Sequence, residues 1–200
     1  MRADHSVLCW GDTQDGKYGP SSGLYTQVSL GPTGGCGIKL DGTIDCGVVY
    51  QMSLTETFDQ LSAGPNQDCG IDASSGGVAC WQAVPVAPPS GTFTQVSVGD
   101  NFACAVRTTG EIVCWGSNVP GVLSPPAGTF VQVTTGGNGA PYVCGLTPEG
   151  TAICWGDNAS ERASPPREPF TEIAAAEGYA CGISKSGKLW CWGLFACQPM

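Results

Sequence analysis

Five segments of this chain repeat one pattern, and each segment carries a pair of cysteines at nearly constant spacing. Every segment opens with an aromatic residue, continues with polar and apolar residues in rough alternation, and reaches a glycine or alanine before the first cysteine. The segments begin at Tyr25, Phe58, Phe93, Phe130 and Phe170, at offsets of 33, 35, 37 and 40 residues. Self-similarity at such a period is typical of repeat architectures in which each unit is one supersecondary element.

A β-hairpin accounts for the cysteine spacing. In the third unit, residues 104–107 and 111–115 flank a short loop that ends at Gly110, and glycine supplies the positive φ that closes such a loop. This register places Cys104 opposite Cys114, where Cβ atoms lie about 4.5–5.5 Å apart, and modest local twist brings a non-hydrogen-bonded pair into disulfide range. We therefore predict one cross-strand disulfide per unit. The predicted pairs are Cys36–Cys46, Cys69–Cys80, Cys104–Cys114, Cys144–Cys154 and Cys181–Cys191.

Composition excludes several classes of protein. Charged residues make up only 12% of the chain while 42% is hydrophobic, which argues against disorder, and 30 glycines and 15 prolines argue against a helical bundle. The net charge is −9, and the eight basic residues are scattered singly, so we expect no nucleic-acid partner. No apolar run approaches the length of about 18 residues that a membrane span needs, so we expect no membrane span.

The cysteine content predicts an oxidising compartment. Twelve cysteines in 200 residues are typical of a secreted or cell-surface protein. The N-terminal residues 1–5 lack the apolar core of a signal peptide, so we expect none in this chain. There is no C-x₂-C pair and His5 is the single histidine, so no metal site is predicted.

Signals for catalysis are poor. A single histidine argues against acid–base or triad chemistry, and the chain has no phosphate-binding or dinucleotide-binding motif. Asp41 and Asp45 flank a hairpin turn and are interpreted as turn formers, with a glycosidase-like carboxylate pair as the alternative. We expect no enzymatic activity and no cofactor.

The units from Gly99 to Asn118 and from Gly136 to Asn158 resemble the regulator-of-chromosome-condensation repeat. Both carry a glycine ahead of the first cysteine, and both end in Cys-Trp-Gly followed two residues later by Asn. The resemblance is to the cysteine-bearing, short-repeat bacterial type, similar to the propeller-type β-lactamase inhibitory proteins. It implies an all-β fold, a β-propeller of small three-stranded blades with a disulfide in each.

The repeats alone define five blades, and the chain ends indicate a sixth. We expect blades at residues 25–57, 58–92, 93–129, 130–169 and 170–193 in a single propeller domain over residues 1–200. Near the N-terminus Cys9-Trp10-Gly11 matches the last strand of a unit, and near the C-terminus Phe195-Ala196-Cys197 matches a middle strand. We therefore predict a seam blade from residues 5–11 and 194–200, which closes the ring through a Cys9–Cys197 disulfide. Six blades is the preferred count. Five is the alternative, because the inner strand of the seam blade is missing, and a fragment of a larger ring is the third possibility.

The functional hypothesis rests on the loops between the first strand and the first cysteine of each unit. These loops vary in sequence while the scaffold repeats, and propeller geometry gathers them around one mouth of the channel. Aromatic side chains are favoured anchors in protein interfaces, and the resemblance implies binding through such a face. The predicted partner-binding residues are Phe102, Tyr142, Tyr179, Asp100, Asn101, Asp68 and Glu177.

The preferred function is an extracellular protein-binding module that uses this loop face, as an inhibitor or adhesin does. A carbohydrate-binding propeller is the alternative, in which the regularly placed Trp81, Trp115, Trp155 and Trp192 would stack on sugars. Packing between blades is the preferred interpretation of these tryptophans. A second alternative is a structural subunit of a surface filament or coat.

Overall fold

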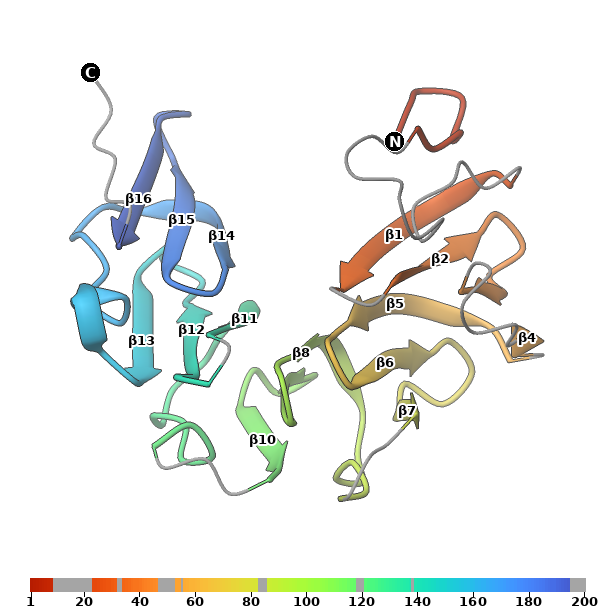
Figure 1. The fold of residues 1–200 in the computed structure, drawn as a ribbon, viewed down its shortest axis with the longest axis horizontal. Helices are drawn as coiled ribbons and strands as arrows, with labels where there is room; N and C mark the ends of the chain where they lie inside the picture. The colour runs from red at the N-terminus through yellow and green to blue at the C-terminus, as the bar shows by residue number, and fades with distance from the viewer. Residues whose placement is uncertain are drawn as a thin grey trace.

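The structure, a computed structural model, describes residues 1–8, 23–31, 34–46, 53–54, 56–82, 86–117, 121–137 and 139–194. Five antiparallel sheets follow one another along the chain, and we refer to them as blades 1 to 5. Figure 1 shows them arranged around an arc, with blade 1 and blade 5 at its two ends. The all-β propeller architecture predicted from the repeats is confirmed.

Blade 1 has four strands and the other blades have three, in an up-and-down order. The strands of blades 1 and 2 are β1 (Tyr25–Gly31), β2 (Gly34–Lys39), β3 (Ile44–Asp45), β4 (Ser53–Leu54), β5 (Phe58–Ala63), β6 (Gln67–Asp72) and β7 (Val78–Gln82). Those of blade 3 are β8 (Phe93–Val98), β9 (Phe102–Arg107) and β10 (Ile112–Gly116). Blades 4 and 5 contain β11 (Gln132–Gly136), β12 (Tyr142–Leu146), β13 (Ala152–Gly156), β14 (Phe170–Ala175), β15 (Tyr179–Ser184) and β16 (Leu189–Gly193), with a short 3₁₀ turn, η1 (Ala159–Glu161), between β13 and β14. The fourth strand of blade 1 exceeds the three strands expected for each blade.

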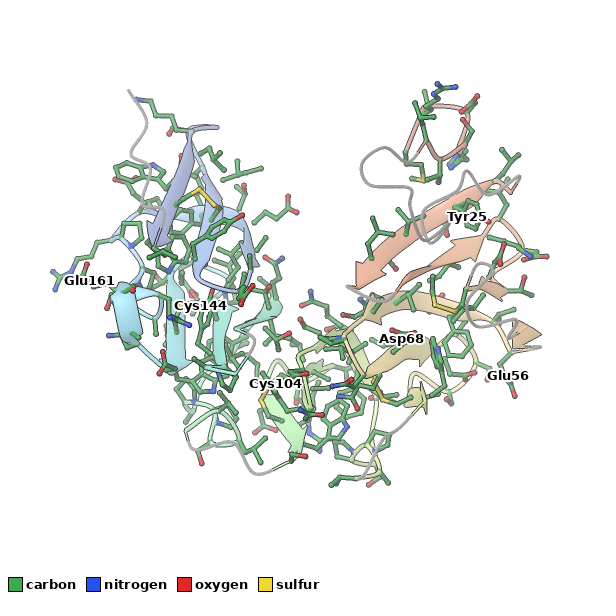
Figure 2. All side chains as sticks on the ribbon, in the orientation of Figure 1. Tyr25, Glu56, Asp68, Cys104, Cys144 and Glu161 are labelled. Carbon is green, nitrogen blue, oxygen red and sulfur yellow. A yellow bond between two sulfur atoms is a disulfide. The ribbon has the colours of Figure 1, made fainter. Side chains whose placement is uncertain are left out.

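The hairpin register is the predicted one. Ile112 pairs with Val106 and Cys104 with Cys114, and the Gly110 that closes this loop has a φ of 91°. All five predicted disulfides are present, with Cα–Cα distances of 3.9 to 4.1 Å. Figure 2 labels Cys104 in blade 3 and Cys144 in blade 4, one cysteine from each of two of these pairs.

The core lies between blades rather than within them. Each blade has one face that carries its disulfide, which we call the disulfide face. The opposite face carries the residue that opens the first strand and the Trp of Cys-Trp-Gly where the blade has one, and we call it the aromatic face. Cys69 and Ile71 of blade 2, for example, pack against Phe93, Val96 and Trp115 of blade 3. The same arrangement joins the other consecutive blades, so Trp81, Trp115 and Trp192 are buried and Trp155 is half-buried, as the packing interpretation predicts.

Polar side chains join the inner strands of neighbouring blades. In blades 1 to 4 a glutamine on the inner strand bonds to the backbone of the next blade, and the serine or threonine two positions later accepts a second N–H. In blade 1, Gln27 Nε2 donates to Leu61 O at 3.0 Å, Leu61 N donates to Gln27 Oε1 at 2.9 Å, and Ala63 N donates to Ser29 Oγ at 2.9 Å. We call this set the glutamine ladder. It satisfies inner-strand backbone groups that would otherwise be left without a partner in the blade interface.

The described residues hold five blades, the alternative count. Most of the predicted sixth blade, residues 9–11 and 195–200, lies outside the described residues, so the count of six is not tested. Residues 5 and 6 of the predicted seam lie against the start of blade 1, where Tyr25 N donates to His5 O at 2.9 Å and Ser6 forms a bridge with Leu24. Cys9 and Cys197 lie outside the described residues, so their disulfide and the closure of the ring stay predictions.

Candidate functional site: the mouth loops

The loops that join the first and second strands of the blades lie on one face of the arc. We call residues 64–66, 99–101, 137–141 and 176–178 the mouth loops; residue 138 lies outside the described residues. Loops of adjacent blades contact each other. Asn66 Nδ2 donates to Asp100 Oδ1 at 2.9 Å between blades 2 and 3, and Gly137 N donates to Ala176 O at 3.1 Å between blades 4 and 5. The repeat therefore assembles four described, sequence-variable segments on one side of the blades.

Two of the predicted anchor residues are buried and cannot contact a partner in this conformation. Phe102 and Tyr142 each have 0% of their surface exposed. A Cβ added to Gly99 would lie 2.3 Å from the Phe102 ring, so the ring folds back beneath its own loop. The Tyr142 hydroxyl donates to Tyr179 O at 2.6 Å and to Ala176 O at 3.1 Å, which fixes the ring between blades 4 and 5. The predicted binding role of these two aromatics is corrected to packing.

Asp68 is also buried, at 3% exposure, rather than on the rim. It occupies the strand position that Ala103, Val143 and Ala180 occupy in blades 3 to 5, all of which are buried. Gly64 N donates to its Oδ1 at 3.1 Å, and its Oδ2 lies 3.5 Å from Sγ of Cys36 in blade 1 (Figure 2). Burial raises the pKa of the Asp68 carboxyl above its ordinary value, since desolvation disfavours the charged form.

The remaining predicted residues reach the surface in two groups. Asp100 is half-buried and Asn101 is exposed, and both accept a hydrogen bond from Asn66 Nδ2. Around blade 5, Glu177 is exposed and Tyr179 is half-buried. The structure thus brings Asp100 and Asn101 together at the junction of blades 2 and 3, and Glu177 and Tyr179 together at blade 5.

Arg162 adds a cation that the sequence pattern did not indicate. Its Nη1 donates to Ala140 O at 3.3 Å and to Glu177 O at 3.4 Å, so it bridges the mouth loops of blades 4 and 5. It also pairs with Asp157, with Nε 3.5 Å from Oδ1. Arg162 belongs to the connection after β13, and nothing in the repeat pattern distinguishes that connection as part of the mouth. Asn66, by contrast, lies within a loop that the pattern had already marked as variable.

One cluster has the residue types of a metal site. The sulfur atoms of Cys36 and Cys46 and a carboxylate oxygen of Asp68 lie within 4.8 Å of one another. Both sulfurs are consumed in a disulfide, and a metal ligand must be a thiolate. The cluster is therefore part of the packing between blades 1 and 2. Within the described ranges, none of the helices has the length and apolar character of a membrane-crossing segment.

Comparisons with known proteins agree with this geometry. Residues 93–119, which make up most of blade 3, match the family model of the Regulator of chromosome condensation (RCC1) repeat. The crystal structure of the CRINKLY WD40 ectodomain from the Arabidopsis thaliana receptor kinase ACR4 is similar, with a TM-score of 0.72 and 25% identity, covering 90% of this chain and 70% of that chain.

Two further structures are similar. The ectodomain of the Physcomitrella patens receptor kinase CR4 has a TM-score of 0.69 at 24% identity, covering 83% of this chain and 52% of that chain. Yeast RCC1 (Prp20), in its structure bound to Kap60, has a TM-score of 0.62 at 14% identity, covering 80% of this chain and 54% of that chain. The chain spans about half the length of these two proteins. It carries an RCC1 repeat at residues 93–119 and has, over most of its length, the propeller fold of RCC1 and of these receptor ectodomains.

Proposed function

We propose that this chain is a secreted or cell-surface module that binds another protein through its mouth loops. The observation that carries the proposal is the contrast between scaffold and loops. The blades repeat one register, one disulfide and one ladder, whereas the mouth loops differ in length and side chains. Loops that vary on a repeated scaffold are suited to a binding surface, because loops carry recognition while the scaffold positions them.

The exposed chemistry of this face favours a protein partner with a basic surface. Asp100, Asn101 and Glu177 offer acceptors, and Tyr179 offers an aromatic ring near Glu177 on blade 5. The whole chain has a net charge of −9, which attracts a cationic surface over a distance of about a Debye length.

The setting of the similar structures supports an oxidising compartment. The five disulfides need an environment in which thiols are not kept reduced, and the ACR4 match is to a receptor ectodomain. Propellers of this kind also include Prp20, which is bound to the protein Kap60 in its crystal structure. The carbohydrate alternative loses its main support, since Trp81, Trp115 and Trp192 are buried between blades and cannot stack on a sugar.

The test is an affinity capture from the native environment with three forms of the chain. The first is the native sequence, and the second carries Asn66→Ala, Asn101→Ala and Glu177→Ala on the mouth loops. The matched control carries Thr109→Ala, Glu111→Ala and Glu149→Ala, three exposed residues at hairpin turns on the opposite side of the blades. A partner captured by the native and control forms but lost with the mouth variant supports the proposal. Loss of every partner with the control, or retention of every partner by the mouth variant, would show that another face binds.

A further inference from the structure

Within the described residues, the disulfide of blade 1 is the one that has an ionisable side chain beside it. Sγ of Cys36 lies 3.5 Å from Oδ2 of Asp68 in blade 2, and the sulfur atoms of Cys36 and Cys46 lie with a carboxylate oxygen of Asp68 within 4.8 Å of one another. In the next three contacts between blades, the residue at the strand position of Asp68 is apolar and shares a core cluster with a cysteine of the preceding blade. These pairs are Ala103 with Cys69, Val143 with Cys104 and Ala180 with Cys144.

The carboxyl group and the two sulfur atoms are enclosed between blades 1 and 2. Asp68, Cys36 and Cys46 are each 3% exposed. Gly64 N donates to Oδ1 of Asp68 at 3.1 Å, which fixes the carboxyl group from one side while Oδ2 faces the sulfur of Cys36. A hydrogen bond in such an enclosed place is stronger than the same bond in water, because the local dielectric constant is low. A change in the donors around Asp68 therefore has a large effect on its energy.

The contact between Asp68 and Cys36 differs between the two redox states of the cysteine pair. A sulfur atom in a disulfide carries no hydrogen, so in the oxidised chain Cys36 cannot donate to Oδ2. Reduced Cys36 has an S–H group in the same place, and a carboxylate is a strong acceptor for it. This hydrogen bond exists only after reduction, so it stabilises the reduced pair relative to the oxidised pair. The apolar residues in the other contacts between blades offer no such bond.

We propose that Cys36–Cys46 is a site of reversible thiol–disulfide exchange with a dithiol reductant, and that Asp68 stabilises its reduced form. A thiolate of the reductant attacks Sγ of Cys46, so that a bond forms between these two sulfur atoms and the Cys36–Cys46 bond breaks. The electron pair of the broken bond stays on Cys36, which takes up a proton and donates its S–H to Asp68. The second thiol of the reductant then attacks the mixed disulfide and releases Cys46. The reductant ends as a disulfide, and the cysteine pair has gained two electrons and two protons.

Exchange at this pair acts on the mouth loop of blade 2 as well as on blade 1. Asp68 holds that loop through Gly64 N, and in the reduced chain the same carboxyl group also accepts from Cys36. Reduction removes the covalent link between β2 and β3 on the disulfide face of blade 1. Because the sulfur atoms are enclosed, the two blades must separate locally before a reductant can reach them. The equilibrium between the redox states, which does not depend on access, is therefore the quantity that reports on Asp68.

Equilibration in mixtures of reduced and oxidised dithiothreitol tests the proposal. Acid quenching, alkylation of the free thiols and peptide mass spectrometry give the reduced fraction of each cysteine pair. Asp68→Ala is the test variant, because blades 3 and 5 already carry alanine at this strand position. We expect it to lower the equilibrium constant for reduction of Cys36–Cys46 by about tenfold, or about 30 mV, the effect of one hydrogen bond to a charged group.

Two controls are matched to this measurement. The Cys104–Cys114 pair of the same molecules packs against Val143, so Asp68→Ala is expected to leave its equilibrium constant unchanged. Asp59→Ala removes an exposed carboxylate from the same blade and is expected to change neither constant. Circular dichroism of each oxidised variant shows that it is folded.

Infrared spectroscopy separates the hydrogen bond from a change in packing. The S–H stretching band of Cys36 in the reduced native chain is expected at a lower frequency than that of a free thiol, and Asp68→Ala is expected to remove this shift. Asp68→Asn keeps the size of the side chain with a neutral acceptor, so its equilibrium constant is expected to lie between those of the native chain and Asp68→Ala. An equilibrium constant that Asp68→Ala leaves unchanged, one that falls without a change in the S–H band, or an equal fall for Cys104–Cys114 would each overturn the proposal.

Discussion

Gln60 of blade 2 is hydrogen-bonded to Val96 of blade 3 through both ends of its side-chain amide. Its Nε2 donates to Val96 O at 3.1 Å, and its Oε1 accepts from Val96 N at 2.7 Å. The side chain therefore pairs with the backbone as a neighbouring strand would, and the same residue type does so from blades 1 and 4. Stability of one blade is coupled in this way to the position of the next.

Replacing Gln60 by Ala is expected to lower the free energy of unfolding by about 1–3 kcal/mol. The loss leaves a buried N–H and a buried carbonyl of Val96 without their partner, which costs more than an exposed hydrogen bond does. Glu172→Ala is the matched control, because Glu172 occupies the same strand position in blade 5 and is exposed. Guanidinium unfolding in dilute solution measures the free energy of unfolding of both variants. If Glu172→Ala lowers it as much as Gln60→Ala does, the glutamine ladder does not stabilise the contact between blades.

The five disulfides are expected to contribute unequally. Each closes a loop of nearly the same length, worth about 3 kcal/mol in the chain-entropy model. Cys104 is completely buried, however, whereas Cys181 is half-buried on the open face of blade 5. Replacing Cys104 and Cys114 by Ala adds a cavity, so we expect this double variant to be about 1 kcal/mol less stable than Cys181→Ala, Cys191→Ala. Equal denaturation midpoints for the two double variants would show that packing around the buried sulfur atoms adds nothing to the stability that the disulfide provides.

Asp68 and Asp72 are expected to affect the pH dependence of stability in opposite directions. Burial raises the pKa of Asp68 above the ordinary value near 3.8, so its favourable contribution is complete below that value and is lost as pH rises through the raised pKa. Asp68→Asn imitates the neutral form and still accepts from Gly64 N–H. We expect this variant to be more stable than the native chain at neutral pH, with the difference vanishing in acid.

The Asp72 carboxylate accepts hydrogen bonds from Ser74 and Ser75, which lower its pKa to about 2. Its contribution is complete above its ordinary pKa near 3.8 and is lost as pH falls through about 2. Asp72→Asn should therefore be less stable than the native chain at neutral pH, with the difference shrinking toward pH 2. Thermal unfolding across the acid range measures both variants, and parallel curves for the two would contradict these assignments.

Tyr142→Phe is expected to destabilise the contact between blades 4 and 5 by about 1–2 kcal/mol, because the buried hydroxyl donates to two backbone carbonyls. Burial raises the pKa of Tyr142 to about 12 from an ordinary value of 10.0. The stability that depends on the neutral phenol is present below pH 10 and is lost as pH rises toward 12. The variant should lack this alkaline dependence, and a spectrophotometric titration of the folded chain should show one tyrosine fewer ionising late. If Tyr142→Phe loses stability at alkaline pH as the native chain does, the ionisation of another group causes that loss.

Much of the scaffold could be predicted from the sequence because it depends on local chemistry. Cys104, Gly110 and Cys114 belong to a single hairpin. Its register, its turn and its disulfide all depend on about 11 consecutive residues. Residues alternate between the two faces of a strand, so Trp115, the neighbour of Cys114, lies on the face opposite the disulfide, where the predicted packing between blades buries it. Repetition of these features five times indicated the propeller.

The candidate site was only partly predictable. The sequence does not distinguish an aromatic residue that anchors a partner from one that packs inside the protein. Phe102 and Tyr142 are both buried inside the protein. Whether such a residue is buried depends on its neighbours in another blade or across the loop. For Tyr142 these are the carbonyl oxygens of Ala176 and Tyr179, which accept hydrogen bonds from its hydroxyl. Arg162 entered the site for a similar reason, since its partners come from loops about 15 and 22 residues away.

The sequence by itself determined the repeating unit, its disulfides and the side of each hairpin on which the aromatic residues lie, because these depend on residues close together in the chain. Tertiary structure alone decided which of the equivalent positions are covered. Ile183 and Val106 occupy the same place in their hairpins, yet Ile183 is 41% exposed and Val106 1%, because Val106 packs against blade 4 whereas no blade within the described residues packs against Ile183. Whether a side chain is buried depends on the blade that packs against it, and the position of that blade is decided by the tertiary structure.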